Sequence, residues 1–400
     1  MSDATHADFE PLRPAPGRGR ARSRAAVGIG SWRISRKSFL YGWWTSLDWR
    51  LAGLCVVLLA TGVLLSFGSS ATAAARLNYD EYHFVLRQVL FAGAAGVVLV
   101  GLSFLTPAGV RRSAVLLYGL ALVLLLVVQF AGHEAKGASR WIRFPGMSLQ
   151  PSELMKPALV IVAAALFTGA DRDLQPRRIV MAFALFALPV FLLLLQPDVG
   201  QTGLLTAAFM TVFFLSGMPV AWTIGLLMVA IVGISLLYFV FPHFAHRIQL
   251  FFNPDTTENY QVQRALDAIA SGGLFGRGPG EGEIKRILPD AHTDFIYSLA
   301  SEEFGLIASV GIILLFAMLV LHGLFRAEEQ KDPFVRVAAA GLICLVGYQA
   351  AINIGVNLNV GPTKGMTLPF VSYGGSSLLG TAITLGFALA LTRRRPGARL

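Results

Sequence analysis

The sequence predicts an all-α, polytopic membrane protein, and three observations support this fold class. Of the 400 residues, 55% are hydrophobic and only 14% are charged, a balance that water-soluble globular proteins rarely have. The apolar residues form about ten runs, each close to the roughly 20 residues that a membrane-spanning helix needs. Arginines gather in the short segments that follow the second, fourth, eighth and tenth runs, as expected for cytoplasmic loops. These features exclude an ordinary cytosolic enzyme.

The chain begins with a polar and basic segment, residues 1–46, that is too poor in apolar residues to fold alone. We expect a disordered cytoplasmic tail. A cleaved signal peptide would place its apolar stretch much closer to Met1, so we interpret the first span as an uncleaved anchor. The arginines of this tail include Arg13, Arg18, Arg20, Arg22 and Arg24.

A membrane domain is predicted for residues 47–395, followed by a short cytoplasmic C-terminus, 396–400. The expected spans are 48–68, 86–106, 113–131, 153–169, 179–195, 199–217, 221–241, 296–325, 336–356 and 368–392. The interruption at Gln196–Asp198 leaves open a second reading, in which two of these spans form one irregular hairpin with a kink.

With the basic tail in the cytoplasm, an even number of spans places the C-terminus there as well and four polar segments on the outer face. These segments are 69–85, 132–152, 242–295 and 357–367. The segment 242–295 is the longest, at about 54 residues, and is rich in glycine. Long segments of this kind are usually functional or disordered, and its aromatic and apolar residues argue against plain disorder. We expect a partly ordered loop that faces the substrate.

A first group of titratable residues precedes the long run at 296–325. Asp294 and His292 lie directly before it, at the expected outer membrane surface. A carboxylate at such a low-dielectric boundary is suited to act as a general base. Alternatively, Thr293 or Asp294 only caps the helix that follows. The adjacent Glu302 and Glu303 would be costly in a bilayer unless paired, so at least one should face a polar cavity.

A second group lies around the start of the fourth span. Arg140 offers a guanidinium group of the kind that binds phosphate oxygens. Glu153 and Lys156 are three residues apart on the predicted helix, so they either pair with each other or contribute to a substrate site.

A third group combines Asn353 and Asn357 with the segments 362–369 and 372–377. Glycine and proline interrupt the helix there and leave amides and hydroxyl groups at membrane depth. Irregular backbone at this depth is tolerated only against protein or in a watery cavity.

The sequence gives no sign of a fixed cofactor. The glycine-rich run lacks the Gly-Lys-Ser/Thr ending of a nucleotide loop, and no HExxH pattern or Cys/His cluster predicts a zinc site. A divalent cation held loosely by acidic groups and a pyrophosphate remains possible. The net charge of +10 is explained by arginines beside the spans, so we expect no nucleic acid partner.

Over residues 45–395 the sequence resembles the SEDS (shape, elongation, division and sporulation) membrane glycosyltransferases, which polymerise peptidoglycan. The residues that carry this resemblance are Gly137–Ile142, Gln150–Glu153 with Lys156, Gln196–Asp198, Ser271–Gly278, Ala291–Ile296 with Glu302–Leu306, and Ser372–Ser377. Asn357, Pro362–Gly365 and Leu368–Pro369 resemble the division-type branch, FtsW, more than the elongation-type branch, RodA. Phe304 and Asp290 replace a more common Leu and Glu.

The resemblance implies ten transmembrane helices and lipid II as both donor and acceptor. It also implies that Asp294 is the essential residue and general base, in an inverting transfer that releases undecaprenyl pyrophosphate. We predict that substrate binding involves Arg140, Glu153, Lys156, Arg277, Lys285, His292, Lys364, Ser372 and Ser376.

The resemblance further implies a class B penicillin-binding protein as partner, together with other division proteins, in the bacterial cytoplasmic (inner) membrane at the mid-cell septum. Three alternatives remain: an elongation-type polymerase, a flippase for the lipid-linked precursor, and a non-catalytic scaffold. A flippase would need ionisable residues deep in several spans, and the predicted spans contain few.

Overall fold

The computed structural model describes residues 40–77, 80, 82–135, 138–144, 147–169, 176–240, 242–252, 260–362 and 365–394. The chain divides into two units, Met1–Thr45 and Ser46–Leu400. In the first unit, the described residues 40–45 are helical. Most of the predicted tail and the C-terminus 396–400 lie outside the described residues.

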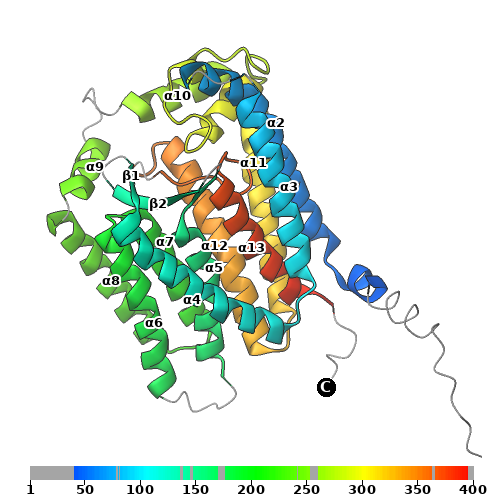
Figure 1. Ribbon diagram of the computed structural model, residues 1–400, viewed down its shortest axis with the longest axis vertical. Helices are drawn as coiled ribbons and strands as arrows, with labels where there is room; N and C mark the ends of the chain where they lie inside the picture. The colour runs from blue at the N-terminus through cyan, green and yellow to red at the C-terminus, as the bar shows by residue number, and fades with distance from the viewer. Residues whose placement is uncertain are drawn as a thin grey trace, which may run out of the picture. The chain divides into compact units, whose positions relative to one another are not determined.

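Ten helices of the second unit correspond to the ten predicted spans, which confirms the fold class (Figure 1). Eight of them are long and apolar enough to cross a membrane. The helices α5 and α7, with 17 residues each, complete the set. The ten helices are α2 (Trp49–Leu77), α3 (His83–Ser103), α4 (Pro107–Ala131), α5 (Pro151–Phe167), α6 (Pro176–Leu195), α7 (Val199–Leu215), α8 (Val220–Val240), α11 (Ile296–Glu328), α12 (Pro333–Asn357) and α13 (Gly375–Thr392).

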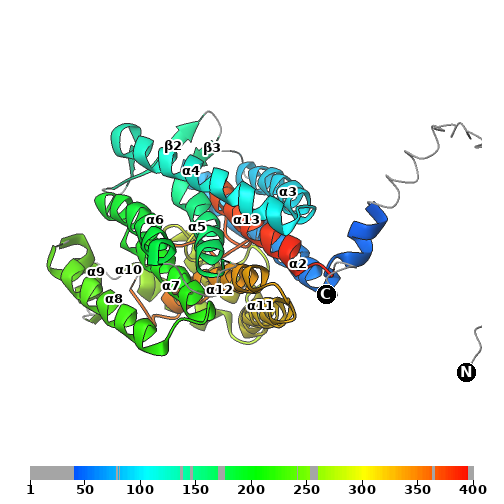
Figure 2. The ribbon, with the colours of Figure 1, turned by 90° about the horizontal axis from the view of Figure 1, so that it is seen from below.

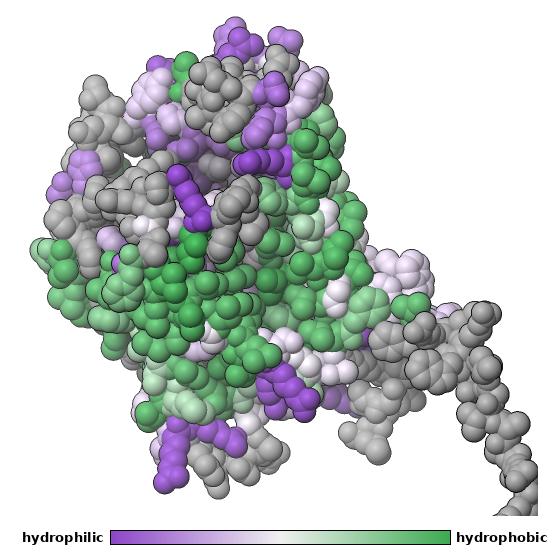
Figure 3. Space-filling model, in the orientation of Figure 1, coloured by the Kyte–Doolittle hydropathy of each residue, from purple (hydrophilic) through white to green (hydrophobic). Residues whose placement is uncertain are grey.

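The arrangement of apolar residues agrees with a protein that spans a membrane. A hydrophobic band covers the middle of the face shown in Figure 3, with hydrophilic residues beyond both of its edges. Viewed from below, α5, α12 and α13 lie in the centre of the bundle, and α8 lies at its edge (Figure 2). The apolar stretches of α12 and α13 are 72% and 83% buried, whereas no residue of α8 is buried. The central helices therefore form the core of the protein.

Two helix boundaries differ from the prediction. The last helix begins at Gly375 and not at residue 368, because residues 368–374 form turns in which Phe370 has a positive φ of 63°. The residues Gln196–Asp198 separate two helices: α6 ends at Leu195, and Asp198 caps α7 by accepting a hydrogen bond from the amide of Gln201 at 3.3 Å. The alternative of one kinked hairpin is therefore not observed.

The segment 132–152, predicted to be a polar loop, contains a small antiparallel sheet of β1 (His133–Ala135), β2 (Ala138–Phe144) and β3 (Met147–Leu149). Ile142 is opposite Leu149 in its register. Strands this short leave little periodicity in a sequence, so the prediction missed them. The sheet lies at the same end of the helices as α10 (Figure 1). We call this the outer end, following the predicted orientation.

The long segment 242–295 is ordered over most of its described residues. It contains α9 (Pro242–Phe252), α10 (Tyr260–Gly272) and a 3₁₀ turn, η2 (Ile284–Arg286). The buried side of α10 carries Val262, Ala265 and Ala268, and this helix packs against α11. The prediction of a partly ordered segment is thus confirmed for the described residues.

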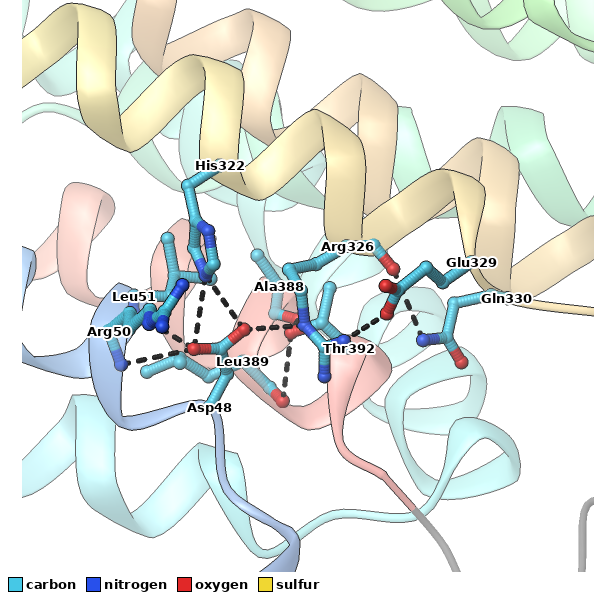
Figure 4. A network of polar contacts seen from close by, with 10 residues as sticks. All are labelled: Asp48, Arg50, Leu51, His322, Arg326, Glu329, Gln330, Ala388, Leu389 and Thr392. Carbon is cyan, nitrogen blue, oxygen red and sulfur yellow. Dashed lines mark hydrogen bonds and ion pairs between the residues drawn. The ribbon is translucent and has the colours of Figure 1, made fainter.

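At the opposite end, a buried ion pair joins α11 to the start of α2 (Figure 4). Asp48 accepts hydrogen bonds from the Arg326 Nε at 2.6 Å and from the amides of Arg50 and Leu51 at 3.0 and 3.2 Å. His322 Nε2 lies 3.0 Å from the same carboxylate. Burial opposes ionisation of Asp48, but the Leu51 amide, His322 and Arg326 hold the pKa of Asp48 below its usual value. The carboxylate form of Asp48 therefore stabilises the fold.

We predict that Asp48→Ala lowers the free energy of unfolding by about 3–5 kcal/mol, because Arg326 would remain buried without its main partner. Glu329→Ala is the matched control: it removes the partly exposed partner of the same arginine and should cost less than about 1 kcal/mol. Thermal unfolding in detergent measures both. Equal losses for the two variants would contradict the assignment.

The sign of the pKa change also predicts a pH dependence. A carboxyl group with a lowered folded-state pKa adds stability above its unfolded-state pKa of about 3.9, and this stability disappears as the pH falls through the folded-state value. The stability difference between the wild type and Asp48→Ala should therefore shrink in acid. A difference that stays constant across that range would be evidence against this linkage.

Candidate active site

Asp294 lies in a compact turn at the outer end of α11. The amides of Thr293 and Asp294 both donate to the carbonyl oxygen of Asp290 at 3.0 Å. The N-cap of α11 is Phe295, so neither Thr293 nor Asp294 takes the capping position that the alternative interpretation assigned to them. Asp294 is partly exposed. The turn thus presents this carboxylate at the end of the helix.

Two amide side chains from α12 fix the backbone of Asp294. Asn353 Nδ2 and Asn357 Nδ2 donate to its carbonyl oxygen at 2.9 and 3.0 Å. Asn357 Oδ1 in turn accepts from the amide and hydroxyl group of Ser298, at 3.2 and 2.7 Å. Both asparagines are buried. Side chains on two helices therefore determine where the Asp294 peptide lies.

The segment 365–374 lies against the same turn. Ser372 donates its hydroxyl hydrogen to the carbonyl oxygen of Thr293 and accepts from the amide of Leu368 at 2.8 Å. Gly365 has a φ of 43°, in the left-handed region that glycine favours, and a Cβ atom there would be in ordinary contact with Asp294 Oδ2 at 3.5 Å, so this segment runs beside the carboxylate. The hydroxyl group of Ser372 connects the two segments.

His292 belongs to a small aromatic cluster beside Asp294. Its ring centroid lies 5.5 Å from that of Phe84 and 5.6 Å from that of Tyr373. The amide of Tyr373 donates to the carbonyl oxygen of His292 at 3.0 Å. The contacts of His292 therefore connect the outer end of α3 to the turns that precede α11 and α13.

A second buried network surrounds the start of α5. Lys156 Nζ donates to Glu153 Oε1 at 2.8 Å and to Gln349 Oε1 at 2.9 Å. Gln349 Nε2 continues the network to the carbonyl oxygen of Thr367, at 3.1 Å, in the segment beside Asp294. Glu153 and Lys156 do pair with each other, as one sequence interpretation expected. They also connect α5 to the segment that borders Asp294.

Arg140 from β2 holds the break between α6 and α7. Its guanidinium group donates to the carbonyl oxygen of Pro197 at 2.8 Å, and its Nε lies 3.7 Å from Asp198 Oδ2. Burial raises the pKa of Asp198, and the positive charge of Arg140 acts in the opposite direction. The Arg140 side chain is 27% exposed, so part of it is still accessible at the outer end.

Lys285 and Arg277 stabilise the glycine-rich segment itself. Lys285 Nζ forms a buried ion pair with Glu303 and donates to the carbonyl oxygen of Gly68 at 3.0 Å. Glu302 accepts from the amides of Ile284 and Lys285 at 2.7 and 2.9 Å. Arg277 pairs with the exposed Glu283 at 3.3 Å. The contacts described here connect these charged groups to this segment, to α2 and to α11.

Two predicted site residues remain without assigned contacts. Ser376, at the start of α13, is buried, and its hydroxyl group has no hydrogen-bond partner among the described residues. Lys364 lies outside the described residues. Within the described part of the chain, no group of three His, Cys, Asp or Glu side chains is placed to hold a metal ion.

The sequence analysis did not identify Gln349 and Gln201 as part of this region. Gln201 Nε2 lies 3.3 Å from Glu153 Oε1, and Gln349 is the link between Lys156 and Thr367. A signal was present in α12, because Gln349, Asn353 and Asn357 follow one another at intervals of four residues in an otherwise apolar helix. Residues at this spacing share one face of a helix.

Comparisons with known proteins agree with this architecture. The chain is 50% identical over 367 residues to the probable peptidoglycan glycosyltransferase FtsW of Caulobacter vibrioides (strain NA1000 / CB15N), covering 92% of this chain and 94% of that protein. It is 36% identical to the protein of the same name from Geobacter metallireducens, covering 86% and 94% of the two chains.

Two solved structures have the same fold. One is described as "Structural coordination of polymerization and crosslinking by a peptidoglycan synthase complex"; its matched chain has a TM-score of 0.72 and 28% identity, with 86% of this chain and 97% of that chain covered. The other is the rod shape determining protein RodA of Thermus thermophilus, with a TM-score of 0.63, 28% identity and coverage of 87% and 97%.

A family model described as "Cell cycle protein", that of FtsW, RodA and SpoVE, matches residues 49–396. This match includes the ten helices that correspond to the predicted spans and the Asp294 turn. The chain therefore belongs to the FtsW/RodA/SpoVE family.

Proposed function

We propose that this protein is a peptidoglycan glycosyltransferase that polymerises lipid II into glycan strands. The observation that carries this proposal is the position of the Asp294 carboxylate at the outer end of a ten-helix membrane domain. The buried side-chain amides of Asn353 and Asn357 hold the backbone of the turn that presents it. The curated relatives that carry the name peptidoglycan glycosyltransferase support it, the first of them at 50% identity.

The chemistry assigned to Asp294 is that of a general base. Its carboxylate accepts the proton of the 4-hydroxyl group of the acceptor sugar, and the oxygen of that group attacks the anomeric carbon of the donor. The bond from this carbon to the pyrophosphate breaks, the configuration inverts, and undecaprenyl pyrophosphate leaves with the electron pair. A general base of this kind typically contributes about 10²–10⁴-fold to a rate.

Cations are needed where charge develops on the leaving pyrophosphate. Arg140 is the strongest candidate, because its guanidinium group is still partly exposed at the outer end. Lys156 and Lys285 are both buried in ion pairs with glutamates, so a role in binding would require those pairs to rearrange. Arg277 is exposed and is a further candidate, whereas Glu153, His292, Ser372 and Ser376 would act mainly by shaping the site.

The family supports a proposal for the partner and for the location. We propose that a class B penicillin-binding protein supplies the crosslinking activity, in keeping with the neighbouring structure described as a peptidoglycan synthase complex. The name FtsW among the relatives favours the cytoplasmic membrane at the division septum, with both termini in the cytoplasm and other division proteins nearby.

Asp294→Asn should reduce lipid II polymerisation by at least about 100-fold, since an amide cannot accept the proton. Purified protein with its penicillin-binding partner, in liposomes with labelled lipid II, measures the rate. Asp267→Asn, which changes an exposed carboxylate of α10, is the control and should be as active as the parent. Polymerisation by Asp294→Asn at the parental rate would refute the assignment of the base.

Asn357→Ala should lower the turnover rate by about 10- to 100-fold with little change in KM, because a displaced catalytic group loses its alignment. Asn357→Gln, which retains the amide, should recover part of the rate if its longer side chain reaches the same carbonyl. Rates are to be compared at a temperature where circular dichroism shows all variants folded. If Asn357→Ala turned over at the parental rate, the hydrogen bond from Asn357 to the Asp294 carbonyl oxygen would not be needed for catalysis.

The Glu153–Lys156 pair can be tested for a role in binding as well as in folding. Lys156→Met leaves Glu153 buried without its cation and should reduce stability by about 3–5 kcal/mol. The double variant Glu153→Gln/Lys156→Met should regain much of this stability. Recovery of stability without recovery of polymerisation would support the predicted binding role; recovery of both would assign the pair to folding alone.

A further inference from the structure

The glycine-rich segment carries two apolar side chains that protrude from it. Leu274 is 60% exposed and Phe275 is 79% exposed, although both lie in a segment predicted to face water. They form the tip of a turn between Gly273 and Gly276, whose φ angles of 56° and 83° are in the left-handed region that glycine favours. The two glycines therefore allow a tight turn that exposes the side chains of Leu274 and Phe275.

Backbone hydrogen bonds attach this turn to α11 at Leu306 and Ile307. The amide of Leu306 donates to the carbonyl oxygen of Gly273 at 2.9 Å, and the amide of Ile307 donates to that of Leu274 at 3.4 Å. Gly305 directly precedes Leu306 and has a φ of 76°. A Cβ atom added at Gly305 would collide with the backbone of Leu274 and Gly276, so the turn and the helix are in close contact there. Leu274 and Phe275 therefore lie beside residues 305–307 of α11.

Two independent observations place the outer boundary of the bilayer at this level. Gly305 interrupts α11, and the helix continues beyond this break from Leu306 to Glu328; at 1.5 Å per residue that part is roughly 35 Å long, close to a bilayer core of about 30 Å. About 20 residues counted outward from Arg326 end near Leu306. The exposure pattern gives the same answer: no residue of 296–305 is exposed. From there the exposed apolar face of α11 comprises Leu306, Ile307, Val310, Ile313, Leu314, Met318, Leu321 and Phe325.

We infer that the Gly273–Gly276 turn inserts Leu274 and Phe275 into the outer leaflet of the bilayer. Their side chains continue the exposed apolar face of α11. The lipid acyl chains that cover Leu306 and Ile307 would therefore also cover Leu274 and Phe275. Arg277 follows directly and is exposed, which suits the lipid phosphates just above the hydrocarbon. The turn thereby anchors the outer segment to the membrane surface.

The anchor also constrains the position of the proposed site. The Asp294 turn precedes the start of α11, and the anchored turn meets α11 at Leu306, beyond the break at Gly305. Asp294 therefore lies on the outer side of the proposed hydrocarbon boundary, where the headgroup of a lipid-linked substrate is found. This consequence rests on the proposed function, whereas the insertion itself does not.

Spin labels test the insertion in the full chain, reconstituted in nanodiscs of phosphatidylcholine and phosphatidylglycerol. Leu274→Cys and Phe275→Cys, each labelled in a Cys55→Ala/Cys344→Ala background, should collide with oxygen at least several times more often than with the water-soluble complex NiEDDA. Glu281→Cys, an exposed position of the same segment, is the aqueous reference, and Val310→Cys is the hydrocarbon reference.

Labels at 274 and 275 should give depths between those of the two references. NiEDDA contact equal to that at 281 would show that the tip is in water and would overturn the inference. Protection from both reagents would also overturn it, because the tip would then be covered by protein. None of these readings depends on polymerisation, so failure of the anchor and failure of the proposed function can be told apart.

Discussion

The hydrogen bonds from Asn353 and Asn357 to the peptide carbonyl of Asp294 are the interaction on which the rest of the outer end depends. They bring α12, a central helix, into contact with the turn that begins α11. Asn353 also donates to the carbonyl oxygen of Met366 at 2.6 Å, so the same side chain positions the segment that leads to α13. Three chain segments that are far apart in sequence therefore meet at one buried pair of amides, and the carboxylate of Asp294 is presented from that junction.

The bilayer explains why the buried charged groups of these networks are paired. Polar groups at membrane depth find no water, so they must be satisfied within the protein. Glu303 pairs with Lys285, Glu302 accepts two backbone amides, and Lys156 is shared by Glu153 and Gln349. These pairs attach the outer segment to α11 and α5 to α12. The same constraint operates at the other end, where Asp48 neutralises Arg326.

Much of the fold follows from the sequence, because a bilayer demands long apolar runs and cytoplasmic arginines. All ten spans correspond to helices, and the Glu153–Lys156 pair was expected from its spacing. The features that depend on tertiary contacts could not be predicted from the sequence. The small sheet is too short to leave a pattern, and α13 starts late because turns occupy residues 368–374. The ion pair of Lys285 with Glu303, 18 residues away in sequence, could not be inferred from spacing, whereas substrate binding by Lys285 stays a prediction. The family resemblance, and not spacing, singled out Asp294 among the neighbouring carboxylates.

The pH dependence of polymerisation tests most directly whether Asp294 is the base. The single-turnover rate of glycan coupling should be measured from mildly acidic to neutral pH for the wild type and for Asp294→Asn. In the wild type the rate should fall as the medium becomes more acidic, because a protonated carboxyl group cannot accept the sugar proton. In the variant the small remaining rate should lose this dependence. A variant that keeps both the parental rate and the parental profile would contradict the account.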